Sequence, residues 1–376
     1  MPMKIVADDK IPFLKGVLEP YSEVLYLPGK QIDNKVLKNA DALLIRTRTK
    51  CNSSLLKGTA IKFIGTATIG NDHIDTEFCR KNDITWTNAP GCNSSSVQQY
   101  IAASLLRISG KFKYKLKNKT IGIVGVGNVG SKVAKLARVL EMNVLLNDPP
   151  RARKEGENGF VSLDQLLIES DIVTAHVPLN MTGEDKTHHL FDEKSFGMMR
   201  RGTWFINSSR GEVMDTAALK SVIDSGKLMG TVVDVWENEP DIDTELLEKA
   251  FLSTPHIAGY STDGKANGTS MTVNSLCKFL NLPLNNWYPD TVPDPAVPVI
   301  LLDCKGKTDE EVVREAVLHT YNIDDDSIRL KHSPAEFEKI RGDYPLRREF
   351  PAYTVIVKGG TRNTRMMLKG MGFKVG

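Results

Sequence analysis

Arginine, glutamate and histidine side chains follow successive apolar segments of the chain in an order that suits acid–base chemistry. Arg210 comes shortly after the apolar residues 203–207, and Glu239 and His256 come after the apolar residues 230–235. A histidine can take a hydroxyl proton, a carboxylate can orient it and raise its proton affinity, and a guanidinium can hold a substrate carboxylate. Together they predict hydride transfer from a hydroxyl-bearing carbon. Taken singly, each has an ordinary alternative as a solvated or structural residue.

A glycine-rich segment at residues 125–130 predicts a dinucleotide site. It reads Gly-Val-Gly-Asn-Val-Gly and lies between an apolar strand at 120–124 and a helical segment at 131–140. In such a loop the first glycine permits a tight turn, the second lets the backbone approach a pyrophosphate, and the third lets helix and strand pack closely. The helix N-terminus then stabilises the phosphate charge. The alternative is a glycine-rich turn without a ligand. The cofactor residues predicted in this loop are Gly125, Gly127, Asn128, Val129 and Gly130.

Asp148 ends the strand after this loop and indicates which dinucleotide is bound. A carboxylate there accepts hydrogen bonds from the adenosine ribose and repels a ribose 2′-phosphate, so NAD is favoured over NADP. Arg151 is the one nearby residue that would accommodate the extra phosphate.

Short apolar segments alternating with helical segments predict an α/β protein. Near the N-terminus they form a small α/β unit, and from residue 120 onward they predict a doubly wound parallel sheet (Rossmann) for NAD. A segment rich in proline at 283–298 reads as a linker. Beyond it, Thr308 and Glu311 form a capping box, and strands at 297–303 and 353–357 complete a small C-terminal α/β domain. We expect a substrate-binding domain at 1–98 completed by 268–284, an NAD-binding domain at 99–267, and a C-terminal domain at 285–376.

Composition excludes several other classes of protein. The 376 residues include 49 basic and 46 acidic side chains, a net charge of +3, which predicts neither a nucleic-acid nor a membrane partner. The N-terminus lacks a signal-peptide pattern and no apolar run could span a bilayer, so we expect a cytoplasmic protein. The five cysteines are scattered without a CxxC pair, which predicts reduced thiols and no metal site.

Over about the first 285 residues the chain resembles the D-isomer-specific 2-hydroxy acid dehydrogenases. The matching segments are the Gly125 loop with Asp148, His176-Val-Pro-Leu, Asn207-Ser-Ser-Arg-Gly, Asp234-Val-Trp-Glu-Asn-Glu-Pro and Thr254-Pro-His-Ile-Ala-Gly. The resemblance implies a flavodoxin-like substrate domain and a catalytic set of Arg210, Glu239 and His256. It also implies further cofactor contacts from Val177, Ser208, Ser209, Arg210, Asp234 and Gly259.

Local details resemble members of the family that act on a phosphorylated acid. These details are the segments at 65–75, 89–93, 148–152 and 256–261. The implied reaction is oxidation of 4-phospho-D-erythronate with NAD in vitamin B6 synthesis, and the implied assembly is a homodimer through the C-terminal domain. Arg48 is as compatible with solvent as with phosphate, and the adjacent Arg347 and Arg348 are expected to be solvated, with a neighbouring subunit's phosphate as the alternative. The implied substrate contacts are Arg46, Thr47, Thr68 and Tyr260.

Two other functions remain open from the sequence. A 3-phosphoglycerate dehydrogenase would act on a substrate with the same functional groups. A non-catalytic NAD-sensing module would reuse the fold, although such a module would not need the three catalytic residue types.

Overall fold

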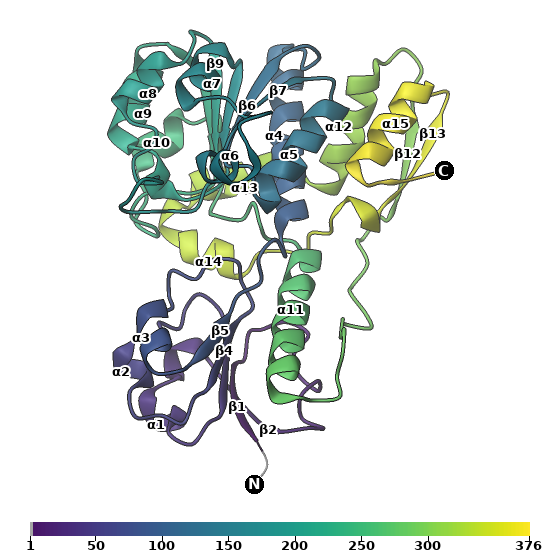
Figure 1. Ribbon diagram of the computed structural model, residues 1–376. Helices are drawn as coiled ribbons and strands as arrows, with labels where there is room; N and C mark the ends of the chain where they lie inside the picture. Colours follow the sequence, from purple (N-terminus) through teal and green to yellow (C-terminus); the bar gives the residue numbers. More distant parts are fainter. Residues whose placement is uncertain (1–2) are drawn as a thin grey trace. The chain divides into compact units, whose positions relative to one another are not determined.

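The computed structural model describes residues 3–376 and divides into two compact units (Figure 1). The first unit comprises the chain up to Asn93 together with Ser261–Pro293. The second unit comprises Ser94–Tyr260 and Asp294–Gly376. Each unit has hydrophobic clusters of its own, and each is described by itself below.

The first unit is a parallel five-stranded sheet in the order β2-β1-β3-β4-β5, the order of flavodoxin-like folds. The C-terminal part of this unit is one long helix, α11, which packs on β4. It begins at Thr262, where the Ser261 side chain caps it by accepting from the Gly264 N–H at 2.8 Å. The elements are β1 (Lys4–Asp8), β2 (Glu23–Leu27), η1 (Gly29–Gln31), α1 (Asn34–Leu37), β3 (Ala42–Ile45), α2 (Ser53–Leu56), β4 (Phe63–Thr66), α3 (Thr76–Lys81), β5 (Thr85–Thr87) and α11 (Thr262–Leu280).

The second unit is built on a parallel six-stranded sheet in the order β11-β10-β9-β8-β6-β7. The strand order reverses between β6 and β8, so loops after these strands diverge and leave room for a ligand at the carboxyl edge. The elements are α4 (Ser94–Phe112), β6 (Thr120–Val124), α5 (Asn128–Val139), β7 (Asn143–Asn147), α6 (Pro149–Glu155), α7 (Leu163–Glu169), β8 (Ile172–Ala175), α8 (Glu193–Met198), β9 (Thr203–Asn207), η2 (Gly211–Val213), α9 (Thr216–Asp224), β10 (Leu228–Val233), α10 (Thr244–Lys249) and β11 (Leu252–Ser253).

The C-terminal segment adds a three-stranded parallel sheet in the order β12-β13-β14. Its helix α12 packs on α4, and α15 packs on α5, so this segment shares one hydrophobic cluster with these two helices of the six-stranded sheet. The elements are β12 (Val299–Asp303), α12 (Asp309–Thr320), α13 (Ile323–His332), η3 (Pro334–Glu336), α14 (Phe337–Gly342), η4 (Phe350–Ala352), β13 (Thr354–Lys358), α15 (Arg362–Met371) and β14 (Lys374–Val375).

The structure confirms the predicted fold class and several local predictions. Both large sheets are parallel and flanked by helices, and the Thr308 capping box opens α12 as expected. The five cysteines are all buried. Within residues 3–376, no helix has the length and apolar character needed to cross a membrane.

Candidate active site

The glycine-rich loop joins β6 to α5 and has the geometry of a phosphate-binding turn. Gly125 has φ +86°, which side-chain-bearing residues rarely adopt, and a Cβ on Gly130 would lie 2.0 Å from the Gly125 carbonyl oxygen. Gly127 is the N-cap of α5 and provides no side-chain hydrogen bond, and a Cβ there would meet open space. The first N–H groups of α5 have no partner within the helix, so they can donate to an anion.

Asp148 links this loop to the next one. Its carboxylate accepts hydrogen bonds from the N–H groups of Val126 at 2.8 Å and Arg151 at 3.1 Å, which fixes it beside the turn. The Arg151 guanidinium donates two hydrogen bonds to Glu155, at 2.8 and 2.6 Å, and one to the Val126 carbonyl at 2.6 Å. The sequence did not indicate the role of Glu155. It pairs with Arg151, the nearby arginine that would otherwise accommodate a ribose 2′-phosphate.

The loop after β9 positions Arg210. The Asn207 amide donates to the Arg210 carbonyl at 2.9 Å and accepts from the Ser209 hydroxyl at 2.8 Å, which closes the loop on itself. A Cβ on Gly211 would lie 2.0 Å from the Trp236 carbonyl group, so only glycine lets this loop pack against the loop after β10. Ser208 Oγ is buried without a hydrogen-bond partner, as expected for a group that faces a bound molecule.

His256 and Glu239 form a hydrogen-bonded pair. Their Nδ1 and Oε2 atoms lie 2.7 Å apart, and Glu239 Oε1 accepts from the Trp236 N–H at 3.0 Å. Burial alone raises the pKa of Glu239, but the hydrogen bond and charge of His256 and the Trp236 N–H outweigh it and hold the pKa below its usual value. A carboxylate only accepts, so the proton of the neutral ring lies on Nδ1 and leaves Nε2 as the base.

His256 is held in an unusual backbone conformation. Its φ is +56°, in the left-handed region that costs about 1–3 kcal/mol for a residue other than glycine. Its N–H donates to the Asp234 carbonyl at 2.7 Å, and the Asp234 carboxylate accepts from the Thr254 hydroxyl at 2.6 Å and the Ile257 N–H at 2.8 Å. The backbone and side chain of Asp234 therefore hold the loop after β11 in place by hydrogen bonds.

His176, which follows β8 at the same edge, does not have the properties of an acid/base group. Burial lowers its pKa to about 3, so the ring stays neutral near pH 7. Its Nε2 lies 3.0 Å from the Thr174 hydroxyl, whereas Nδ1 has no partner. Among the predicted motifs, His256 is thus the histidine with a carboxylate partner.

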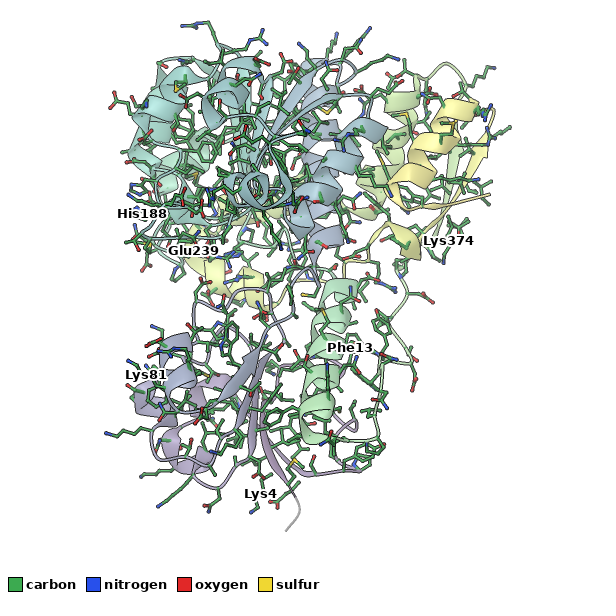
Figure 2. The ribbon with its side chains drawn as sticks, in the orientation of Figure 1. Lys4, Phe13, Lys81, His188, Glu239 and Lys374 are labelled. Carbon is green, nitrogen blue, oxygen red and sulfur yellow. The ribbon has the colours of Figure 1, made fainter. Side chains whose placement is uncertain are left out.

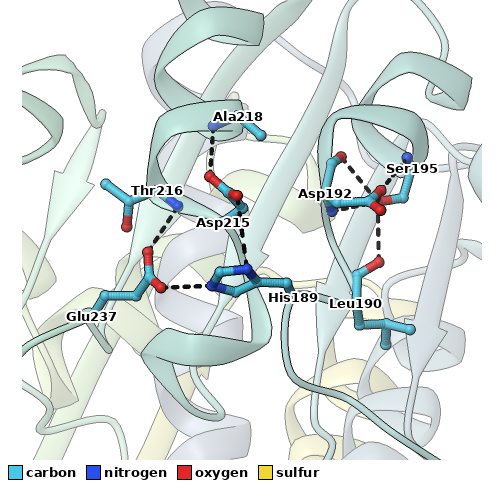
Figure 3. A network of polar contacts seen from close by, with 8 residues as sticks. All are labelled: His189, Leu190, Asp192, Ser195, Asp215, Thr216, Ala218 and Glu237. Carbon is cyan, nitrogen blue, oxygen red and sulfur yellow. Dashed lines mark hydrogen bonds and ion pairs between the residues drawn. The ribbon is translucent and has the colours of Figure 1, made fainter.

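A second histidine–carboxylate pair, not predicted from the sequence, supports the Glu239 loop (Figure 3). His189 Nε2 lies 2.8 Å from Glu237 Oε1, and Glu237 Oε2 accepts from the Thr216 N–H at 2.9 Å. The ring centroids of His188 and His189 are stacked 4.0 Å apart. Because His189 contacts Glu237, which belongs to the Glu239 loop, His188 also lies close to this loop (Figure 2). Glu237 belongs to the Asp234–Pro240 motif, so this motif was the one sequence feature that could have indicated the pair.

In the first unit, the predicted substrate residues gather at the carboxyl edge of adjacent strands. Arg46 follows β3 and forms an ion pair of 3.4 Å with Asp8, which ends β1 and is almost fully buried. Thr68 follows β4, and its hydroxyl lies 2.8 Å from that of Thr66. Thr47 lies in the exposed turn after Arg46. Asp8 was missed, because its partner lies 38 residues away in the sequence.

The expectation that Arg347 and Arg348 are solvated is wrong. Both side chains are buried, Arg347 with 4% and Arg348 with 9% of its surface exposed. Arg347 Nη2 donates to the carbonyl oxygens of Ile257 at 3.0 Å and Ala258 at 2.7 Å, so its hydrogen bonds lie within its own chain rather than at a neighbouring subunit. Tyr260, at the end of the same loop, packs edge-on against Tyr344.

The residues of the second unit fit a bound dinucleotide. The Gly125 loop, Val177, Ser208–Arg210, Asp234 and the His256–Gly259 loop follow β6, β8, β9, β10 and β11, and the carboxyl ends of parallel strands meet at one edge. The N-terminus of α5, which has no side-chain cap, suits a pyrophosphate. The Asp148 carboxylate suits the ribose hydroxyls, and the buried Ser208 hydroxyl, which has no partner in the protein, suits a polar group of the bound cofactor. Fold and site together define a nicotinamide-dependent dehydrogenase.

Comparison with known proteins gives the family. Residues 96–258 match the model of the D-isomer specific 2-hydroxyacid dehydrogenase NAD binding domain, and residues 294–371 match a domain of unknown function. The chain is 52% identical to an erythronate-4-phosphate dehydrogenase of Bacteroides thetaiotaomicron, covering 94% of this chain and 99% of the relative. It is 39% identical to that of Proteus mirabilis, covering 99% of each. The chain therefore belongs to the erythronate-4-phosphate dehydrogenase family and is an NAD-dependent 2-hydroxyacid dehydrogenase.

A solved structure agrees with this assignment. D-lactate dehydrogenase of Aquifex aeolicus, complexed with NAD and lactic acid, superimposes with a TM-score of 0.62 at 28% identity. The match covers 74% of this chain and 95% of that one.

Proposed function

We propose that this chain oxidises 4-phospho-D-erythronate at its 2-hydroxyl with NAD, giving (R)-3-hydroxy-2-oxo-4-phosphooxybutanoate for the synthesis of pyridoxal 5′-phosphate. The observation that carries the proposal is the 2.7 Å contact between His256 and Glu239 at the sheet edge that also holds the glycine-rich loop. Membership in the erythronate-4-phosphate dehydrogenase family supports the substrate.

The proposed proton path runs through His256. With Nδ1 donating to Glu239, Nε2 takes the proton of the substrate 2-hydroxyl as the carbon–oxygen double bond forms. The ionised Glu239 then stabilises the charged ring, because the two groups are 2.7 Å apart and mostly shielded from water. In the reverse direction the same ring returns the proton to the 2-oxo group.

Arg210 is proposed to bind the substrate carboxylate and polarise the neighbouring oxygen. Bound NAD supplies the nicotinamide carbon that accepts the hydride. Asp234 holds the His256 loop by hydrogen bonds. Arg46, Thr47, Thr68 and Tyr260 are proposed substrate contacts, and Arg46 is the one among them with a positive charge for an anionic group.

We also propose that two copies of the chain associate through the β12-β13-β14 sheet. One face of β12 and β13 is buried, whereas the other exposes three large apolar side chains, and a fourth is exposed two residues before β12. A second copy with the same apolar face would bury both faces, which is the usual logic of a two-fold dimer. The side chains are Val297, Val299, Leu301 and Ile356, with 53%, 45%, 74% and 46% of their surface exposed. Five buried cysteine thiols support a cytoplasmic location for the protein.

The function is tested by turnover with matched substrates. The purified protein is incubated with NAD and, in separate assays, 4-phospho-D-erythronate, D-3-phosphoglycerate and D-lactate, and NADH absorbance is followed. His256→Ala is expected to lower kcat at least ~100-fold, because it removes the general base. His319→Ala, on the exposed face of α12, is the control and is expected to retain full activity.

Each alternative has its own outcome. Oxidation of 3-phosphoglycerate in preference to erythronate phosphate would assign the other phosphorylated acid as substrate. Tight NAD binding with no turnover of any acid would favour an NAD-sensing module and contradict the proposed catalysis.

A further inference from the structure

Arg347 is a buried cation that contacts the loop of the proposed catalytic histidine. Its Nη2 donates to the carbonyls of Ile257 and Ala258, the two residues after His256, and to the Ser96 hydroxyl at the start of α4. A charged side chain is costly to bury unless it is compensated, so this position is expected to serve a specific interaction.

The compensation for Arg347 comes from its own C-terminal segment. The guanidinium lies over the ring of Tyr321 at 4.4 Å and that of Tyr344 at 5.5 Å. Both tyrosine hydroxyls donate to Asp326 Oδ2, at 3.0 and 2.7 Å, and Arg347 Nη1 lies 3.3 Å from the Tyr344 hydroxyl. Burial lowers the pKa of Arg347, but the two tyrosines and Asp326 outweigh it, so the side chain stays charged.

The backbone that follows His256 is held by two charged side chains. Asp234 accepts from the N–H groups of Ile257 and Ala258, at 2.8 and 2.9 Å, and Arg347 donates to the carbonyls of the same two residues. An acidic and a basic group thus bracket two consecutive residues, and His256 directly precedes them in its left-handed conformation. These contacts lie directly next to His256, whose ring meets Glu239 at 2.7 Å.

We propose that Arg347 is a positioning residue for His256, so that the C-terminal segment, which matches a domain of unknown function, completes the catalytic loop of its own chain. The proposal rests on the function proposed above for His256. It gives residues 294–371 a role within one chain that is independent of any association between chains.

The test uses the full-length enzyme with Arg347→Lys and Arg347→Ala. Lysine keeps the charge, but its compact ammonium lacks the planar guanidinium that lies over the Tyr321 and Tyr344 rings while Nη2 donates to the loop. We expect Arg347→Ala to lower kcat on the order of 100-fold, because a small misplacement of a catalytic group is enough for that loss. NAD affinity, measured by protein fluorescence quenching, is expected to change less than about 3-fold, since the glycine-rich loop is untouched.

Two readouts separate positioning from a merely structural role. The acid limb of the kcat/KM pH profile is expected to differ from that of the wild type, because a loosened loop changes the 2.7 Å contact between the His256 ring and the Glu239 carboxylate. Methylguanidinium is expected to restore part of the kcat of Arg347→Ala, whereas equal concentrations of sodium chloride or urea do not.

Further variants keep the test decisive if Arg347→Ala folds poorly. Tyr344→Phe keeps the ring beside Arg347 but removes the hydroxyl that joins it to Asp326, and it is expected to shift the pH profile in the same direction by a smaller amount. Arg329→Gln is the control, since Arg329 pairs with the same Asp326 at 3.4 Å but does not contact the loop. An Arg329→Gln enzyme with the same defect as Arg347→Ala would overturn the proposal.

Failure of this proposal is distinguishable from failure of the function. If His256→Ala is inactive while the Arg347 variants keep wild-type kcat and pH profile, only the positioning role is wrong. If His256→Ala remains active, the proposed chemistry itself is wrong, whatever Arg347 does.

Discussion

At the scale of single residues, the proposed chemistry depends on how Glu239 is kept ionised inside the protein. Its carboxylate has two partners, the His256 ring at 2.7 Å and the Trp236 N–H at 3.0 Å. Both favour the charged form, and they outweigh burial, which raises the pKa. An ionised Glu239 is what makes Nε2 of His256 the free base.

Glu239→Gln is expected to lower kcat at least about 10-fold at neutral pH, because an amide keeps the hydrogen bond but not the charge that stabilises the protonated ring. The folded-state pKa of Glu239 lies below its usual value of 4.5, so its stabilising effect is present above that pH and is lost as pH falls through the folded value. The Tm difference between wild type and variant should therefore be constant near neutrality and shrink below pH 4.5, as measured by thermal scans across pH. A constant difference down to the acid limit would contradict this account.

At the scale of elements, two loops at the carboxyl edge are locked together by close approach of their backbones. The loop after β9 carries Arg210, and the loop after β10 carries Glu239. Gly211 is the contact between them, since a Cβ there would overlap the Trp236 carbonyl and the Glu237 nitrogen. The relative positions of the proposed carboxylate-binding and base-orienting groups thus depend on a residue without a side chain.

Gly211→Ala is expected to destabilise the fold by about 1–3 kcal/mol, because the extra methyl forces backbone to move in a packed site. kcat/KM is expected to fall more than 10-fold as the two loops separate. Denaturant titration and steady-state kinetics measure the two effects. Gly197→Ala is the matched control, because its Cβ would meet open space within helix α8, and it is expected to be neutral or slightly stabilising. An active, fully stable Gly211→Ala enzyme would show that the loops do not depend on this contact.

At the scale of the whole molecule, the C-terminal segment has two faces with different proposed roles. Its helices α12 and α15 pack on α4 and α5, and Arg347 holds the loop after His256. The opposite face of its sheet carries the exposed apolar residues, with Leu301 the most exposed at 74%. One segment would therefore serve both the catalytic loop and association with a second copy.

Leu301→Lys is expected to convert a dimer into a monomer, because it places a charge at the centre of the apolar face. Light scattering after size-exclusion chromatography gives the mass of each form. Ile168→Lys is the control, since Ile168 is 52% exposed on α7 of the NAD-binding sheet, away from β12 and β13, and is expected to leave the mass unchanged. A monomeric wild type, or a dimeric Leu301→Lys protein, would exclude this face as the interface.

Longer strands could be predicted from the sequence, whereas the shortest ones could not. Strands of four or more residues, such as β6 and β9, are predicted by their apolar runs, whereas β5, β11 and β14 have only two or three residues and no period to detect. At the start of α11, Gly264 and Gly268 weaken the helical pattern in the sequence. In the structure they lie where the helix approaches Asn93 and the Ala67 backbone closely, so glycine is required.

The sequence by itself determined the cofactor loop, its choice of NAD and the order of the catalytic motifs, because each depends on residues close together in the chain. A tight turn, a helix N-terminus and an acid at the next strand end are local features. Tertiary structure alone decided the partners of those motifs. Arg347 contacts Ile257 across 90 residues and Glu237 contacts His189 across 48, and no local pattern specifies pairs that only packing brings together.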